Sequence, residues 1–330
     1  MKLLPPTRPT ALAAVVLAFT LAAPLGAQAQ TKWDMPTPYP DTNFHTKNLK
    51  QFAEEVSAAS GGKLNITVHS NGSLIKHPDI KRAVQTGQVP IGEVLVSLQA
   101  NESPLYAFDS NPFLADSYSE SKKLWGAAKA PLSKRLDSQG IGLLYSVAWP
   151  PQGIYTKKPI ESTADLKGTK FRTYSPTTSR FSELMGAVPT TVQVPEIPQA
   201  FRTGLVDAMI TSGSTGVDTQ AWDYLTHYYD VQAFLPHNMV IVNKDALAKL
   251  DTGTQKLVLE AAARAETRGW AASAAENDRV VKLMAEKGIK VLPPSAKLKA
   301  ELAAIGKQMA EEWVKRSGAE GEAILAGYRK

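Results

Sequence analysis

The sequence contains no cysteine among its 330 residues. This absence excludes disulfide bonds, thiolate metal sites and cysteine nucleophiles. The chain also lacks low-complexity segments and flexible linkers, so two domains would have to be joined by regular structure. Its basic residues are scattered and mostly alternate with acidic ones, and the net charge of +6 is small for 330 residues. Such a charge pattern gives no indication of a nucleic-acid partner.

Patterns of common catalytic and cofactor sites are missing as well. The five histidines show no metal-binding spacing, and each is expected to be a surface or capping residue. GIGLLY, starting at Gly140, lacks the third glycine of a dinucleotide loop, and SGSTG, starting at Ser212, lacks the first glycine of a nucleophile elbow. No catalytic residue, metal or cofactor is predicted. A histidine and a carboxylate brought together by folding remain an open alternative.

The N-terminal segment has the pattern of a secretory signal peptide. Lys2 and Arg8 precede an apolar run, Ala11–Ala23, and small residues end at Ala29. The run is shorter than the roughly 20 residues of a membrane-spanning helix, which disfavours the alternative of an anchor. Residues 1–29 are therefore interpreted as a signal peptide. An exported chain without disulfides fits the bacterial periplasm.

One motif occurs twice, about 117 residues apart: PDIKRAVQTGQV from Pro78 and PEIPQAFRTGLV from Pro195. Each copy predicts a short helix that ends at a glycine and is followed by an apolar strand. TKWDM and TKFRTY, upstream of the two copies, each lead from a strand into a helix, at residues 43–59 and 176–185. Alternating strands and helices predict an α/β fold with two similar lobes and a cleft between them.

Two long helices complete the predicted architecture. The first covers about 254–287, begins at a capping box formed by Thr252 and Gln255, and is long enough to run across both lobes. The alternative is a peripheral packing helix. The second is expected from Ser295 to about Lys315.

Arg172 is the strongest candidate for binding chemistry. It lies at the end of an expected strand, directly before a helix start with Ser175 as N-cap and Pro176 at the first helical position. A helix N-terminus carries partial positive charge, and a guanidinium can hold both oxygens of a carboxylate. This arrangement favours a carboxylate clamp, with a solvated strand end as the alternative. Upstream, Trp149 is expected near the cleft, where the chain passes between lobes.

The chain resembles the DctP family, the solute-binding proteins of tripartite ATP-independent periplasmic (TRAP) transporters. The resemblance covers essentially the whole mature chain, and the segments that carry it are the signal peptide, HPDIKRAVQTGQV, NPFL, KKPIESTADLKGTKFRTYS and VPEIPQAFRTGLVDAMIT. It implies a bilobed periplasmic-binding-protein fold in which two α/β lobes are linked by crossing segments and bridged by a long helix. The expected division is 30–148 plus about 236–275 for lobe I, and 149–235 plus about 276–330 for lobe II.

The resemblance also implies a binding site. The family's carboxylate-binding arginine falls on Arg172, but Gln152 replaces the second arginine of sialic acid binders, Thr211 replaces a ligand-binding asparagine, and Leu95 replaces a polar or acidic group. These replacements favour a monocarboxylate with a 2-oxo, 2-hydroxy or lactam group, such as pyroglutamate, with room for an apolar or aromatic tail. The expected ligand-binding residues are Arg172, Gln152, Trp149, Thr211, Ser212, Ser214, Leu95, Tyr39 and Trp222.

The function implied is a periplasmic receptor that binds a small organic acid and delivers it to the small and large TRAP membrane subunits. Two alternatives stay open from sequence alone. The chain could be a periplasmic hydrolase or lyase, which turnover of the bound acid would reveal, or a ligand-binding partner of a sensor kinase.

Overall fold

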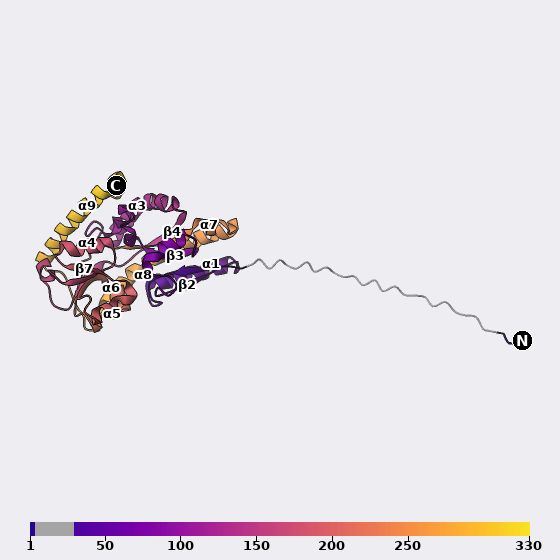
Figure 1. Ribbon diagram of the computed structural model, residues 1–330, viewed down its shortest axis with the longest axis horizontal. Helices are drawn as coiled ribbons and strands as arrows, with labels where there is room; N and C mark the ends of the chain where they lie inside the picture. The colour runs from indigo at the N-terminus through magenta and orange to yellow at the C-terminus, as the bar shows by residue number, and fades with distance from the viewer. Residues whose placement is uncertain (4–29) are drawn as a thin grey trace.

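The computed structural model describes residues 1–3 and 30–330. The interpretation of 1–29 as a signal peptide therefore lies almost entirely outside the described residues. In the part of the chain that is described, no helix combines the length and apolar character needed to cross a membrane. Figure 1 shows the arrangement of the helices and strands, with α1, β2 and α7 toward one side of the molecule and β7, α5 and α6 toward the other.

The first lobe contains two small sheets. Strands β1 (Thr31–Pro36) and β2 (Leu64–His69) pair in parallel, and α1 (Phe44–Ala59) connects them. The second sheet has the order β3–β10–β4 and is antiparallel, with bounds Ile91–Leu95, His237–Asn243 and Ile141–Ala148. Because β10 lies far along the chain, the chain must return to the first lobe after passing through the second.

The second lobe is built on a six-stranded mixed sheet in the order β11–β9–β5–β8–β6–β7. The strand bounds, in that order, are Lys290–Leu292, His227–Tyr229, Gln152–Thr156, Ala208–Ser212, Lys170–Thr173 and Val188–Thr191. Strands β6, β7 and β8 run parallel to one another, and β5 is antiparallel to β8 and β9. These sheets establish the predicted bilobed α/β architecture, while the exact residue boundaries of the lobes remain a prediction.

Shorter elements cover the sheets and connect the strands. Besides α1 and the two long C-terminal helices described below, the helices are α2 (Ile80–Gln85), α3 (Tyr118–Asp137), α4 (Pro176–Leu184), α5 (Ile197–Arg202), α6 (Gly213–Asp218) and α7 (Lys244–Ala248). Turns of 3₁₀ helix occupy His77–Asp79, Val96–Gln99, Pro104–Ser110, Thr163–Leu166, Val194–Glu196 and Ala221–Asp223.

The repeated motif forms the same unit in each lobe, as the sequence predicts. Helices α2 and α5 each follow a proline-containing 3₁₀ turn and each precede a buried strand, β3 or β8. Gly87 and Gly204 follow the two helices with φ of 72° and 67°. This left-handed conformation is readily adopted only by glycine, so these two residues allow each helix to end at the same place in the repeat.

Helix α8 (Thr252–Glu286) bridges the two lobes. Its N-terminal half buries Val258 and Ala265 in the core of the first lobe, and Met284 near its end packs in the core of the second. With 35 residues it extends roughly 50 Å. The expected capping box at Thr252 is wrong by one position, because Asp251 is the N-cap and its carboxylate accepts from both the N–H and the hydroxyl of Thr254. Aspartate is preferred to threonine at the N-cap.

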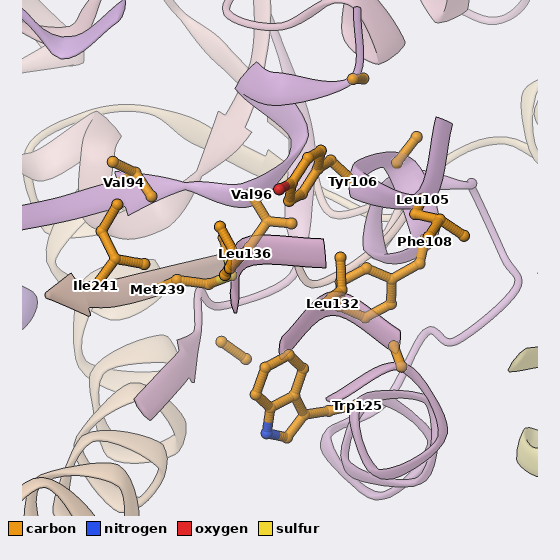
Figure 2. Close-up of a cluster of buried hydrophobic side chains, with 14 of the residues drawn as sticks. Val94, Val96, Leu105, Tyr106, Phe108, Trp125, Leu132, Leu136, Met239 and Ile241 are labelled. Carbon is orange, nitrogen blue, oxygen red and sulfur yellow. The ribbon is translucent and has the colours of Figure 1, made fainter. Parts of the chain in front are cut away.

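Helix α9 (Ala296–Tyr328) contacts both lobes and is divided by a kink at Gly318, whose φ of 55° and ψ of −142° are not helical. Its first part ends close to the predicted end near Lys315, and a second helical segment follows the kink. Leu302 packs in the core of the second lobe, whereas Trp313 and Ile324 pack in the core of the first. Figure 2 shows part of that first-lobe core, where side chains of α3, β10 and the 104–110 turn meet, among them Trp125, Leu132, Met239, Ile241 and Phe108.

A substitution at Gly306 tests how closely α9 packs against the rest of the protein. A Cβ atom at this position would lie 2.3 Å from the backbone oxygen of Pro112, which cannot move as a side chain can. Gly306→Ala is expected to lower the free energy of unfolding by about 1–3 kcal/mol in a urea titration. Gly126→Ala is the matched control, because Gly126 lies in α3 with no atom within 4 Å of the new methyl group. That control should raise stability by up to ~1 kcal/mol, and equal effects of the two substitutions would contradict the packing.

Candidate functional site

A cavity lies between the two lobes and contains about 340 Å³ of space not filled by atoms. The residues that line it are Tyr39, His77, Leu95, Trp149, Gln152, Arg172, Tyr174, Gln193, Val194, Thr211, Ser212, Thr215 and Pro236. The two repeated units contribute equivalent segments to opposite walls, since His77 and Val194 each directly precede the proline of one repeat.

Arg172 provides the positive charge of the cavity. Alternation along β6 places Phe171 in the core of the second lobe and turns Arg172 and Tyr174 toward the cavity. The Arg172 side chain is 1% exposed, and its Nε donates to the Val192 carbonyl oxygen at 2.9 Å. Its guanidinium carbon lies 5.0 Å from the centre of the Tyr174 ring.

The guanidinium has unused binding capacity. Its Nη1 is buried without a hydrogen-bond partner, and among residues 1–3 and 30–330 no carboxylate lies within 4.0 Å of Arg172. Burial lowers the pKa of Arg172 to about 10, which still leaves it positively charged at neutral pH. A buried cation that lacks an anionic partner is costly, and an anion in the cavity would relieve that cost.

Gln152, at the start of β5, is held by two hydrogen bonds. Its Oε1 accepts from the Tyr174 hydroxyl at 2.9 Å, and its Nε2 donates to the Pro150 carbonyl oxygen at 2.9 Å. The amide therefore keeps one N–H hydrogen and one lone pair for a further partner. Thr211 and Ser212, at the end of the neighbouring strand β8, lie on the same side of the site.

The first lobe contributes a rigid aromatic wall. The Trp149 indole N–H and the Tyr39 hydroxyl both donate to Asn238 Oδ1, at 2.9 and 3.2 Å. The two rings meet edge to face with centroids 4.8 Å apart. Burial, together with the charge of Glu93, raises the pKa of the Tyr39 hydroxyl well above its usual value, so Tyr39 stays a neutral donor.

His77 connects the two lobes and is neutral. Its Nδ1 bonds Gln193 Oε1 at 3.0 Å, and its Nε2 accepts from the Leu95 N–H at 3.3 Å, an arrangement that requires the proton on Nδ1. Burial lowers its pKa to about 4. The expectation that every histidine is a surface or capping residue is wrong, because His77, His45, His227 and His237 are all buried. The spacing of the histidines along the sequence cannot show which of them become buried, because their burial depends on packing between distant parts of the chain.

The structure brings together most of the residues selected from sequence. Seven of them line the cavity: Arg172, Gln152, Trp149, Thr211, Ser212, Leu95 and Tyr39. Ser214 does not line it, although it is buried in α6 with its hydroxyl unpartnered. Trp222 lies against the core that contains Tyr155, with the Lys287 ammonium 5.8 Å from its ring, and is also absent from the lining.

Sequence reasoning missed several lining residues: His77, Tyr174, Gln193, Val194, Thr215 and Pro236. Two signals could have found some of them. Tyr174 lies two positions after Arg172 and so shares its face of the strand, and the repeat itself marks the segments directly before Pro78 and Pro195. The expectation that the α4 start forms the anion site with Arg172 is also wrong, since Ser212 and Thr215 at the start of α6 line the cavity instead.

A charged cavity between two α/β lobes that share bridging helices defines a two-lobed solute-binding protein for a small anion. The chain belongs to the bacterial extracellular solute-binding proteins, family 7, whose model matches residues 37–317. Family 7 is also named DctP, so the predicted family is confirmed.

Solved structures of three relatives extend the comparison. DctP7 of Bordetella pertussis, an extracytoplasmic solute receptor binding pyroglutamic acid, is 54% identical with a TM-score of 0.90, covering 91% of this chain and 100% of that one. DctP6 of the same organism, also a receptor binding pyroglutamic acid, is 49% identical with a TM-score of 0.89 and coverages of 91% and 99%. A marine metagenome TRAP solute-binding protein specific for pyroglutamate is 43% identical with a TM-score of 0.90 and coverages of 91% and 99%.

These comparisons establish the class of function. The chain is a TRAP solute receptor for small organic acids and not an enzyme, so the hydrolase or lyase alternative is set aside.

Because Arg172 has no carboxylate partner among the described residues, replacing it is not expected to lower the free energy of unfolding. The pKa of Arg172 is lower in the folded protein than in the unfolded chain, so at pH 7.5 its charge disfavours folding, and that cost begins to decline only above about pH 10. Arg172→Met should leave the free energy of unfolding of the ligand-free protein unchanged or higher in a urea titration. Arg268→Met is the control, because Arg268 bonds Glu55 and Asn48, and it should cost ~1 kcal/mol or more. A large loss in Arg172→Met would instead assign Arg172 a structural role.

Proposed function

We propose that the chain is the periplasmic receptor of a TRAP transporter and that its ligand is pyroglutamate. The observation that carries this proposal is the buried Arg172 guanidinium, which faces a small cavity and has no carboxylate partner among the described residues. Three similar structures of 43–54% identity, each of a protein described as binding pyroglutamate or pyroglutamic acid, support the choice of ligand.

The carboxylate of the ligand is assigned to Arg172. Nη1 is free to donate, and the planar guanidinium can donate two parallel hydrogen bonds to the two oxygens of a carboxylate. The Tyr174 ring and the Val192 carbonyl oxygen hold the guanidinium in place, so little side-chain entropy remains to be lost on binding.

The lactam group is assigned to the neutral polar side chains around Gln152. A lactam has one N–H donor and one carbonyl acceptor side by side, and the Gln152 amide has one free donor and one free acceptor site. Thr211 and Ser212 add hydroxyl groups on the same wall. The remaining predicted contacts are the aromatic and apolar surfaces of Trp149, Tyr39 and Leu95. Ser214 and Trp222 do not line the cavity, so we assign them no contact with the ligand.

The composition of the cavity disfavours ligands with a second charge. Among the described residues that line the cavity, Arg172 is the one cationic side chain, and His77 is kept neutral by burial. A second carboxylate would therefore lie against Leu95, Val194 or Trp149, where it would lose its hydration without gaining a partner. This argument favours a monocarboxylate over succinate or sialic acid.

Delivery and location complete the proposal. The small and large TRAP membrane subunits are the proposed partners, and residues 1–29 are the proposed signal peptide that directs the chain to the periplasm. Family membership supports both assignments, since the family consists of bacterial extracellular solute-binding proteins. The alternative docking partner, a sensor kinase, has no observation in its favour.

Ligand preference is tested with a panel of acids. L-Pyroglutamate should raise the melting temperature of the protein more than 2-oxo acids, 2-hydroxy acids, succinate or sialic acid, and titration calorimetry should rank the affinities in the same order. L-Proline is the matched control, because it keeps the ring and the carboxylate but has an ammonium group in place of the lactam. Equal stabilisation by L-proline, or preference for succinate, would show that the lactam assignment is wrong.

The Arg172 clamp is tested by substitution. Arg172→Ala removes the cationic partner of a desolvated carboxylate, so affinity for L-pyroglutamate should fall by roughly 2–5 kcal/mol, or about 30-fold to several thousand-fold. Arg172→Lys keeps the charge but loses the two parallel donors, and it should recover only part of the loss. Calorimetric titration of each variant gives these values. Unchanged affinity in Arg172→Ala would move the carboxylate elsewhere in the cavity.

A further inference from the structure

Two groups of side-chain hydrogen bonds cross the cleft between the lobes. The first joins His77, at the start of the first repeat, to Gln193, at the start of the second, with 3.0 Å between Nδ1 and Oε1. The second joins the loop before α1 to the end of α6: Asn43 Nδ2 donates to Asp218 Oδ2 at 2.6 Å, and Thr42 Oγ1 donates to Asp218 Oδ1 at 3.4 Å. Both groups would break if the two lobes moved apart, because their donors and acceptors lie on opposite lobes.

The first of these bonds closes one wall of the cavity. His77 and Gln193 both line the cavity from opposite lobes. Both nitrogens of His77 are occupied by protein partners, so this residue has no hydrogen bond left for a ligand. Its contribution to binding would therefore come from holding the lobes together.

The hydrogen bond between Asn43 and Asp218 joins two residues whose positions are fixed by helices, one on each lobe. Asn43 is the N-cap of α1, and its Oδ1 accepts from the His45 N–H at 2.8 Å, which aims its Nδ2 at Asp218. Asp218 is the last residue of α6, the helix whose N-cap Ser212 lines the cavity. Asp218 itself does not line it. Closure thus brings a carboxylate of the second lobe onto a donor that the first lobe already holds in place.

We propose that the His77–Gln193 and Asn43–Asp218 hydrogen bonds are two closure latches, and that His77 and Asp218 are positioning residues that set ligand affinity through the closed fraction. Apparent affinity scales with the fraction of protein in the binding-competent form, so a residue that acts only on closure still changes it. The inference rests on the proposed function, because closure is measured through binding of the proposed ligand.

The two latches differ in their response to pH. A proton on Nε2 of His77 would point at the Leu95 N–H, so the closed form disfavours protonated His77, and its pKa is lowered to about 4. The charged groups that act on it are Glu93, from β3, and Arg172, from β6. Closure at this latch is fully favourable above the ordinary histidine pKa of ~6.5 and weakens as the pH falls toward 4.

Asp218 responds in the opposite direction. Burial raises its pKa to about 6, and Glu276 adds to the rise, whereas Asn43, Thr42 and Lys47 oppose it. Arg279, which bonds Glu276 on α8, is also close enough to interact with Asp218. Because the closed form favours protonated Asp218, closure at this latch strengthens as the pH falls from 6 toward 4.

The opposed responses should nearly cancel in the intact protein. Between pH 7.5 and 5.0, linkage gives a loss of about 30-fold in affinity from His77 and a gain of about 10-fold from Asp218, so the net change is about threefold. The carboxylate of the ligand stays ionised over this range, since such groups have pKa values near 3.5.

The experiment is calorimetric titration of L-pyroglutamate at pH 7.5 and 5.0. With Asp218→Asn only the His77 response remains, and affinity should fall about 30-fold at the lower pH. With His77→Gln, which keeps an N–H donor for Gln193, affinity should rise about 10-fold. His69→Gln is the control, because His69 pairs with Asp34 on the surface and should behave as the unmodified protein. A flat pH response in both latch variants would overturn the proposal.

A second measurement separates this proposal from the choice of ligand. Because the chain has no cysteine, spin labels at Glu54→Cys on α1 and Gln199→Cys on α5 report the distance between lobes by pulsed electron paramagnetic resonance. His77→Ala should shift the ligand-free distribution toward longer distances at pH 7.5, and His77→Gln should restore it. Failure of L-pyroglutamate to bind, combined with these shifts, would reject the ligand and retain the latches, whereas unshifted distances would reject the latches.

Discussion

The site depends on one electrostatic constraint, a buried guanidinium without a carboxylate partner in the described part of the chain. Arg172 can stay in place because β6 lies between β7 and β8, and because a backbone carbonyl and an aromatic ring contact the cation. These contacts fix its orientation but supply no opposite charge. The missing charge must come from the ligand, and this requirement makes the cavity selective for an anion before any other contact is considered.

The two lobes supply different parts of the recognition. The second lobe carries the charge and the neutral amide of Gln152, and the first lobe contributes a surface whose shape is fixed by hydrogen bonds to Asn238. Since the first-lobe wall has no free cation, it can exclude a second carboxylate but cannot attract one. Selectivity then arises from the ligand groups that each wall excludes as well as from the groups that each wall binds.

Most of the architecture and half of the cavity could be predicted from the sequence. Each of three features can be read from residues that are close together in the sequence: the repeat, the strand that carries Arg172 and the long bridging helix. Such patterns predict the local structure whatever the rest of the chain does. Thr215 and Pro236 could not be predicted in the same way, because their place in the cavity follows from packing between residues far apart in the chain. Ser214 is expected to offer its hydroxyl to the ligand, but it lies inside α6, which begins at Gly213, and it does not line the cavity.

The bridging helices have a further consequence, for the cooperativity of the molecule. α8 buries Val258 in one lobe and Met284 in the other, and α9 does the same with Trp313 and Leu302. Neither lobe can lose its core without exposing side chains on a helix that the other lobe also needs. Heating should therefore melt the protein in a single calorimetric transition, as one thermodynamic domain, although its sheets form two structural ones.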